Sequence, residues 1–102
     1  MRIVSWNILD GGGGRAALIA EQLERWQPSV VVLCEYRGTQ PSQTLASHLS
    51  EMGLTPQRST VATDHRAKNA LLVASRWPLR LCENDKLHRV MTTIDLKPAE
   101  AT

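Results

Sequence analysis

Two polar residues with the chemistry of a metal or phosphate site each follow an apolar segment of this sequence. Asn7 comes directly after Met1 to Trp6, and Glu35 comes directly after Ser29 to Cys34. If both segments are strands of one βαβ unit, both polar residues lie at the same edge of the sheet, where ligands bind in α/β proteins. An amide beside a carboxylate at that edge is suited to a metal ion or a phosphate group.

The same two residues also allow a purely structural interpretation. A carboxylate after a run of apolar residues is costly to desolvate unless it is hydrogen-bonded, paired or bound to a cation. Glu35 could nevertheless simply occupy the first exposed position beyond the strand. Asn7 could be a turn residue whose side chain satisfies the local backbone.

The first half of the sequence has the pattern of alternating strands and helices. Arg2 to Trp6 is β-branched and aromatic, and Val30 to Cys34 is apolar without alternation, which is typical of a central strand covered on both faces. Between them, apolar residues recur near helical spacing from Arg15 to Trp26. A second helix is expected from Gln43 to Met52, closed by Gly53.

Short β-type runs replace this alternation after Pro56. The links between them are short and polar, so neighbouring runs are more easily joined as antiparallel hairpins than as crossovers. The sequence therefore predicts an α/β fold in which a βαβα half is followed by an antiparallel β meander. The expected strands of this meander are Arg58 to Ala62, Ala70 to Ser75, Leu79 to Glu83 and Arg89 to Leu96.

The composition indicates one globular domain. The chain has 102 residues, of which 42% are hydrophobic and 22% are charged, and these values argue against disorder and against a fibrous chain. The net charge of +2 permits a polyanionic partner without requiring one. No apolar run approaches the ~20 residues of a membrane span. The apolar run at the N-terminus is too short for the hydrophobic part of a secretory signal. We therefore expect a cytoplasmic protein.

The glycine run Gly11 to Gly14 allows more than one interpretation. With Ala16 it has the outline of a dinucleotide-binding fingerprint, because it follows a strand, opens a helix and is followed by the acidic Glu35. However, Asp10 would place a carboxylate beside the pyrophosphate, and a homopolymeric run matches almost any glycine pattern. A flexible connection and an active-site loop that touches substrate are the alternatives to a nucleotide-binding βαβ module.

Three segments resemble the endonuclease/exonuclease/phosphatase superfamily, the DNase I-like metal-dependent phosphodiesterases. They are Arg2 to Asn7, Gln27 to Glu35 and Asn69 to Leu79, and they occur in the family's order. The resemblance implies part of a four-layered α/β sandwich. It also implies a phosphodiester or phosphomonoester hydrolase, a nuclease or a phosphatase, whose substrate is a nucleic acid or another phosphoester.

Four residues are candidates for this site: the resemblance points to Glu35, Asn7 and Asn69, and Arg37 is a candidate because it lies just past Glu35. Glu35 would ligate an essential Mg²⁺, with Mn²⁺ as a possible substitute, and Asn7 would take part in the same metal and phosphate site. Arg37 could meet a substrate phosphate, although an exposed loop arginine is more often only solvated. Asn69 could contact substrate or could be a turn residue before a strand.

The match covers only the N-terminal part of the family's domain. No Asp-x-Asn pair and no Ser-Asp-His run follows the third matching segment, and Asp64-His65 stands too early in the chain to replace them. Residues 1–102 are therefore expected to be an apparently truncated N-terminal portion that is inactive alone. Alternatives are a non-catalytic remnant, self-association and pairing with a separate C-terminal half.

Overall fold

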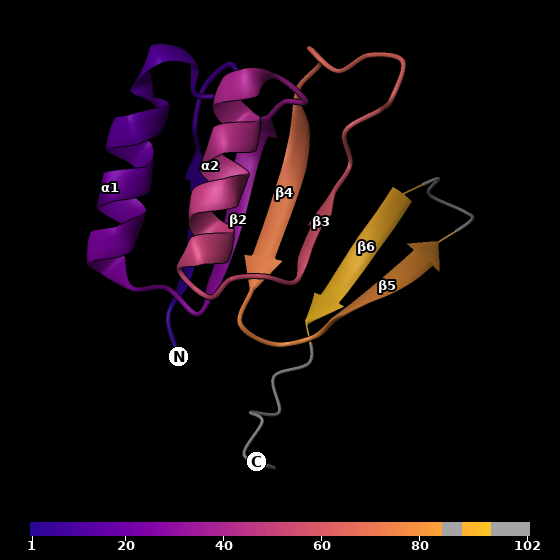
Figure 1. Ribbon diagram of the computed structural model, residues 1–102. Helices are drawn as coiled ribbons and strands as arrows, with labels where there is room; N and C mark the ends of the chain where they lie inside the picture. Colours follow the sequence, from indigo (N-terminus) through magenta and orange to yellow (C-terminus); the bar gives the residue numbers. More distant parts are fainter. Residues whose placement is uncertain (85–88, 95–102) are drawn as a thin grey trace.

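The computed structural model describes residues 1–84 and 89–94 (Figure 1). None of the helices in this part of the chain is long and apolar enough to cross a membrane. The elements in chain order are β1 (Ile3–Asn7), the short 3-10 helix η1 (Gly13–Arg15), α1 (Ala16–Trp26), β2 (Val30–Tyr36), α2 (Gln40–Glu51), β3 (Gln57–Ser59), β4 (Ala70–Ser75), β5 (Leu79–Asn84) and β6 (Arg89–Ile94).

Four strands form a mixed sheet in the order β1-β2-β4-β3. β1 and β2 are parallel, whereas β4 is antiparallel to both β2 and β3. Figure 1 shows α1 and α2 side by side on one face of this sheet. The expected α/β class and the βαβα order of the first half are confirmed, and the parallel pairing places the ends of β1 and β2 at one edge.

The core lies between the two helices and the sheet. Both helices are amphipathic, and their apolar residues face the strands because that arrangement removes the most apolar surface from water. The rings of Trp6 and Trp26 extend this core toward β1, with centroids 5.2 Å apart. The fully buried members include Leu23, Val31, Leu33, Leu45, Leu49 and Ala74.

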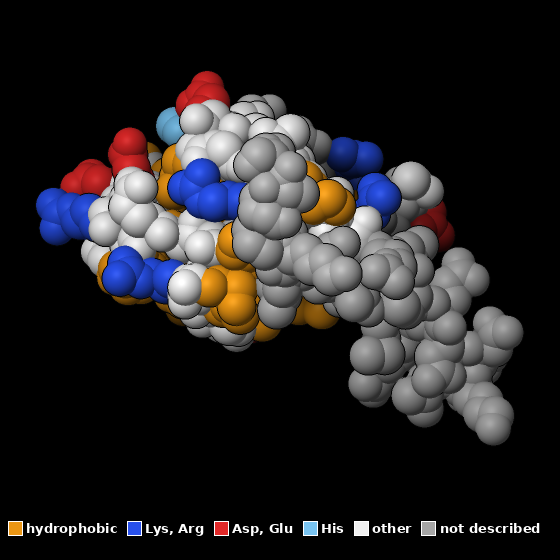
Figure 2. Space-filling view, turned by 90° about the horizontal axis from the view of Figure 1, so that it is seen from below, with side chains coloured by type: hydrophobic (Ala, Val, Ile, Leu, Met, Phe, Trp, Pro, Cys, Tyr) orange, Lys and Arg blue, Asp and Glu red, His pale blue; other side chains and the backbone are white. Residues whose placement is uncertain are grey.

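The opposite face of the four-stranded sheet carries exposed apolar side chains. Asn7 is in register with Cys34, which is in register with Leu71, so all three lie on one face, and Ile3 shares it by strand alternation. Ile3 is 55% exposed and Leu71 is 43% exposed. Figure 2 shows hydrophobic side chains along the lower side of the molecule. Self-association and pairing with a C-terminal half remain predictions.

The predicted meander is only partly correct. β3 and β4 form an antiparallel pair, and so do β5 and β6, but β5 and β6 form a separate two-stranded sheet. The reason is that β4 already pairs with β2 on one side and β3 on the other, so it offers no free edge to β5. The chain leaves the sheet at Arg76, whose N–H donates to the carbonyl of Ser29 over 3.0 Å.

The boundaries of other elements also differ from the expected ones: β1 includes Asn7, and β2 extends to Tyr36. α2 begins at Gln40 rather than Gln43, because Pro41 sits in the first helical turn, where its missing N–H costs nothing. β3 covers Gln57–Ser59 instead of Arg58 to Ala62. Residues 95 and 96 of the last expected strand lie outside the described residues.

Candidate functional site at the carboxyl edge of β1 and β2

Asn7 and Glu35 touch each other at the carboxyl edge of the two parallel strands. Nδ2 of Asn7 donates to Oε2 of Glu35 over 2.8 Å. The orientation of this amide follows from its second partner, because Oδ1 of Asn7 accepts from the N–H of Leu9 over 2.9 Å. The parallel register, with Asn7 opposite Cys34, brings the two side chains together as the sequence predicted.

Glu35 occupies a bulge inside β2 and not the position after the strand. The pairing with β4 shifts register between Cys34 and Tyr36, and Glu35 has φ of +61°. A residue other than glycine seldom adopts this left-handed conformation, which costs of order 1 to 3 kcal/mol and occurs often at functional sites. The bulge directs the carboxylate toward the loop that follows β1.

The pKa of the Glu35 carboxyl is held below its usual value of 4.5. The largest cause is the N–H of Asp10, which donates to Oε1 over 2.9 Å, followed by the amide of Asn7. Partial burial acts in the opposite direction, and the positive charge of Arg37 makes a smaller favourable contribution. Glu35 is therefore an anion near neutral pH, and each of its oxygens keeps a lone pair for a cation.

Arg37 connects the remaining predicted site residues to this pair. Its Nη2 lies 3.0 Å from Oδ1 of Asp10, and its Nε donates to Oδ1 of Asn69 over 2.7 Å. Asn69 thus joins the site through Arg37 and not through Glu35. Nη1 of Arg37 has no partner in the described part of the chain, so it can donate to a phosphate oxygen. One polar network contains Asn7, Glu35, Asp10, Arg37 and Asn69.

The glycine run folds back onto the end of β2. The N–H of Gly11 donates to the carbonyl of Glu35 over 2.8 Å, and the N–H of Gly12 donates to the carbonyl of Leu9 over 2.9 Å. Two of the amides that a phosphate-binding loop would offer are therefore used internally. The nucleotide-binding hypothesis stays a prediction, and the loop is a closed structure that holds the Asp10 N–H against Glu35.

Ser42 is a member of this arrangement that sequence reasoning missed. Its fully buried hydroxyl donates to the carbonyl of Gly11 over 2.7 Å and accepts from the N–H of Arg37 over 3.1 Å. It thereby joins α2 to both the glycine run and the end of β2. A serine in the first turn of a helix gives no sequence signal for such a role. From the sequence, Asp10 is only an obstacle to pyrophosphate binding, whereas in the structure it supplies an N–H to Glu35 and a carboxylate to Arg37.

The donor set at this edge fits Mg²⁺. No group of three His, Cys, Asp or Glu side chains that could hold a metal occurs among the described residues. Magnesium does not need one, because it is often held by one or two carboxylates together with waters and substrate phosphate oxygens. Glu35 supplies an anionic carboxylate, and the oxygen of Asn7 keeps a second lone pair beyond its bond to Leu9.

The Asp64-His65 pair precedes the segment Asn69 to Leu79 in the chain. In this structure it lies in the exposed loop between β3 and β4, where Nε2 of His65 is 3.9 Å from Oδ2 of Asp64. No hydrogen bond joins His65 to Glu35 within residues 1–84. Asp64 and His65 come before Asn69 to Leu79 in the chain, and this early position argues against a catalytic role.

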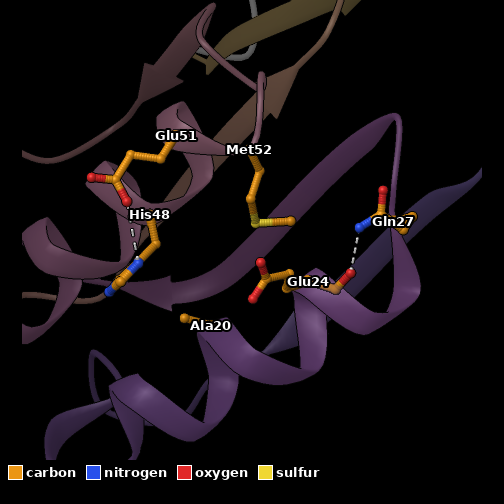
Figure 3. Close-up of a pocket in the computed structure, with 6 residues that line it drawn as sticks. All are labelled: Ala20, Glu24, Gln27, His48, Glu51 and Met52. Carbon is orange, nitrogen blue, oxygen red and sulfur yellow. Dashed lines mark hydrogen bonds and ion pairs between the residues drawn. The ribbon is translucent and has the colours of Figure 1, made fainter.

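A hollow lies between the helices at the end of the sheet opposite to the network around Glu35. It has a volume of about 200 Å³ (Figure 3). It is bounded by Glu24 from α1, by His48 and Glu51 from α2, and by Gln27 and Met52, which directly follow the two helices. In Figure 3 the side chain of Met52 extends between the helices, and His48 faces Glu51, with Nδ1 and Oε1 3.7 Å apart. This hollow shares no residue with the network around Glu35.

No protein-family model and no curated protein matches this sequence. The geometry around Glu35 and the sequence motifs that contain Asn7, Glu35 and Asn69 are therefore the basis for assigning a function.

Proposed function

We propose that the chain is the N-terminal portion of a Mg²⁺-dependent phosphoester hydrolase of the DNase I-like type, in which Glu35 holds the metal. One observation carries the proposal. The carboxylate of Glu35 is oriented by Asn7 and by the Asp10 N–H at the carboxyl edge of two parallel strands, and these hydrogen bonds keep it ionised.

The network gives each residue a distinct task in this proposal. Glu35 provides the anionic ligand, and Asn7 orients that ligand and offers one further amide oxygen. Arg37 is held by Asp10 and Asn69, so its free Nη1 binds a non-bridging phosphate oxygen. When bound, Mg²⁺ would polarise the phosphoryl group and stabilise the leaving oxygen.

The residues around Glu35 make up only one half of the proposed catalytic centre. In the family that the sequence resembles, an Asp that activates water and a His that stabilises the phosphate come from later motifs, and Asn69 to Leu79 is the last matching segment here. We therefore expect metal and phosphate binding by these residues, and no hydrolysis until a segment carrying both groups is added.

Isothermal titration with MgCl₂ and with MnCl₂ tests the metal site. Wild type is expected to bind one ion weakly, and Glu35→Gln is expected to lose that binding because it removes the anionic oxygen while keeping the size of the side chain. Glu24→Gln is the matched control, because Glu24 is an exposed carboxylate that lies outside the network around Glu35. Equal affinities in wild type and Glu35→Gln would remove Glu35 as a ligand and overturn the proposal.

A further inference from the structure

A pocket on the helix-covered side of the sheet lies next to the network around Glu35. It has a volume of about 210 Å³, and its lining includes Tyr36, Gly38, Gln43, Val61, Thr63 and Arg66. None of the side chains that line it is a carboxylate. The pocket therefore offers one cation, neutral hydroxyl and amide groups and an apolar wall, which is the chemistry of a site for an oxyanion.

The backbone around the pocket is held by a contact that only glycine permits. The N–H of Gly38 donates to the carbonyl of Arg66 over 2.6 Å, and Nε of Arg66 donates to the carbonyl of Gly38 over 3.1 Å. A Cβ on Gly38 would lie 2.8 Å from Cγ1 of Val61 and 3.0 Å from Cβ of Arg66. The guanidinium of Arg66 is thus fixed through Nε, while its terminal nitrogens keep their N–H donors for a ligand.

Tyr36 provides a neutral hydroxyl in the same pocket. The residue is only 6% exposed, and none of the side-chain hydrogen bonds within the described residues involves its hydroxyl. Burial raises the pKa of Tyr36, and the positive charge of Arg66 opposes this increase only in part. The tyrosine therefore stays protonated near neutral pH and can donate to an anion beside Arg66.

The pocket and the Glu35 network are built from the same two segments. Arg37 of the network is followed in the chain by Gly38 of the pocket. The loop between β3 and β4 supplies Asn69 to Arg37 and Arg66 to Gly38. The pocket and the network are therefore neighbours along both segments.

We infer that this pocket binds a phosphate group, held by Arg66 and the hydroxyl of Tyr36. The inference deepens the proposed function and rests on it in one respect. The phosphate in the pocket is the second phosphate of the phosphoester whose first phosphate lies at Glu35 and Arg37. The substrate class is then an ester with two neighbouring phosphates, such as a short 5′-phosphorylated nucleic acid strand.

An NMR titration with inorganic phosphate tests the pocket without any metal. Phosphate is expected to shift the amide resonances of Gly38, Thr63 and Arg66 in wild type. Arg66→Gln is expected to bind about tenfold more weakly, because it loses hydrogen bonds to a charged group. Arg25→Gln, which removes an exposed arginine from α1, is expected to bind as wild type does.

Tyr36→Phe keeps the buried ring and removes only the hydroxyl, so it separates binding from folding. It is expected to weaken phosphate binding severalfold with the cooperative unfolding of wild type retained. Glu35→Gln is expected to keep phosphate binding in the pocket, so loss of the metal site alone does not affect this result. Absence of shifts at Gly38 and Arg66 in wild type, or equal affinities in wild type, Arg66→Gln and Arg25→Gln, overturns the inference.

Two dinucleotides distinguish a free phosphate site from a substrate subsite. The 5′-phosphorylated thymidine dinucleotide is expected to bind more tightly than the same dinucleotide without its 5′-phosphate, and Arg66→Gln is expected to abolish the difference. Equal binding of both dinucleotides to wild type would refute the second-phosphate assignment.

Discussion

Nδ2 of Asn7 lies 2.8 Å from Oε2 of Glu35, and this hydrogen bond joins the carboxyl ends of two parallel strands. The donor is neutral and the acceptor is an anion, so the contact favours the ionised carboxyl. It also fixes the direction of the carboxylate, since the Asn7 amide is itself oriented by the N–H of Leu9, which donates to Oδ1 of Asn7.

Asn7→Ala is expected to raise the pKa of Glu35 toward 4.5, because the amide of Asn7 is the second-largest cause of its depression. The shift should be partial, since the N–H of Asp10, which is the largest cause, remains. A ¹³C NMR titration of the Glu35 side chain measures it. An unchanged pKa would show that the amide does not stabilise the anion.

Glu35 is expected to make the protein less stable as the solution is acidified. Its pKa is lower in the folded chain than in the unfolded chain, so between the two values the unfolded state binds more protons. The contribution is complete above about pH 4.5 and is lost as the pH falls through the folded-state pKa. Urea unfolding across this range should show a shallower acid slope for Glu35→Gln. Glu24→Gln should keep the wild-type slope, and a Glu35→Gln slope as steep as that of wild type would contradict the expectation.

The left-handed backbone at Glu35 predicts a difference between two substitutions that both remove the carboxylate. Glu35→Gly is expected to be more stable than Glu35→Ala by about 1 kcal/mol, because only glycine adopts φ of +61° without strain. Urea denaturation of the two variants measures this difference directly. Equal stabilities would mean that the bulge is not retained.

Gly11→Ala is expected to destabilise the protein by at least about 1 kcal/mol. Gly11 has φ of +76°, and a Cβ there would lie 3.0 Å from Cδ of Arg37. Gly14→Ala is the matched control, because a Cβ on Gly14 meets nothing within 4 Å. Thermal unfolding should therefore separate the two variants. Similar melting temperatures would argue against close packing of Arg37 on the glycine run.

Ser42→Ala is expected to destabilise by about 1 to 3 kcal/mol, because it leaves the Arg37 N–H and the Gly11 carbonyl without their shared partner. Ser47→Ala, on the exposed side of α2, should be neutral or slightly stabilising because alanine is the better helix former. Urea unfolding of both variants provides the comparison. A neutral Ser42→Ala would mean that water replaces the hydroxyl.

The sequence predicts the positions of the site residues better than it predicts their contacts. Hydrophobic patterning places β1, α1 and β2, and the parallel connection then brings Asn7 and Glu35 to one edge. The bulge at Glu35 could not be predicted, because it depends on the register with β4, far along the chain. The same is true of Asn69, which reaches the site only through the side chain of Arg37.

The meander shows a different limit of sequence reasoning. Local patterns identify the strands Ala70–Ser75 and Leu79–Asn84 correctly within a residue, yet they do not show which edges of a sheet remain free. Which edges are free depends on the whole sheet. Both edges of β4 are occupied, one by β2 and the other by β3, so β5 cannot pair with β4.

The parallel pairing of β1 with β2 also determines when the site forms during folding. Parallel strands can meet only after the crossover through α1 has closed, and contacts distant in sequence are slow to form. Asn7 and Glu35 are 28 residues apart, and Arg37 and Asn69 are 32 apart. An isolated hairpin or helix of this chain therefore cannot bring together Glu35 and the groups that stabilise its carboxylate. The network around Glu35 serves as a reporter of completed sheet assembly, and its appearance in refolding kinetics should coincide with the final burial of Trp6 against Trp26.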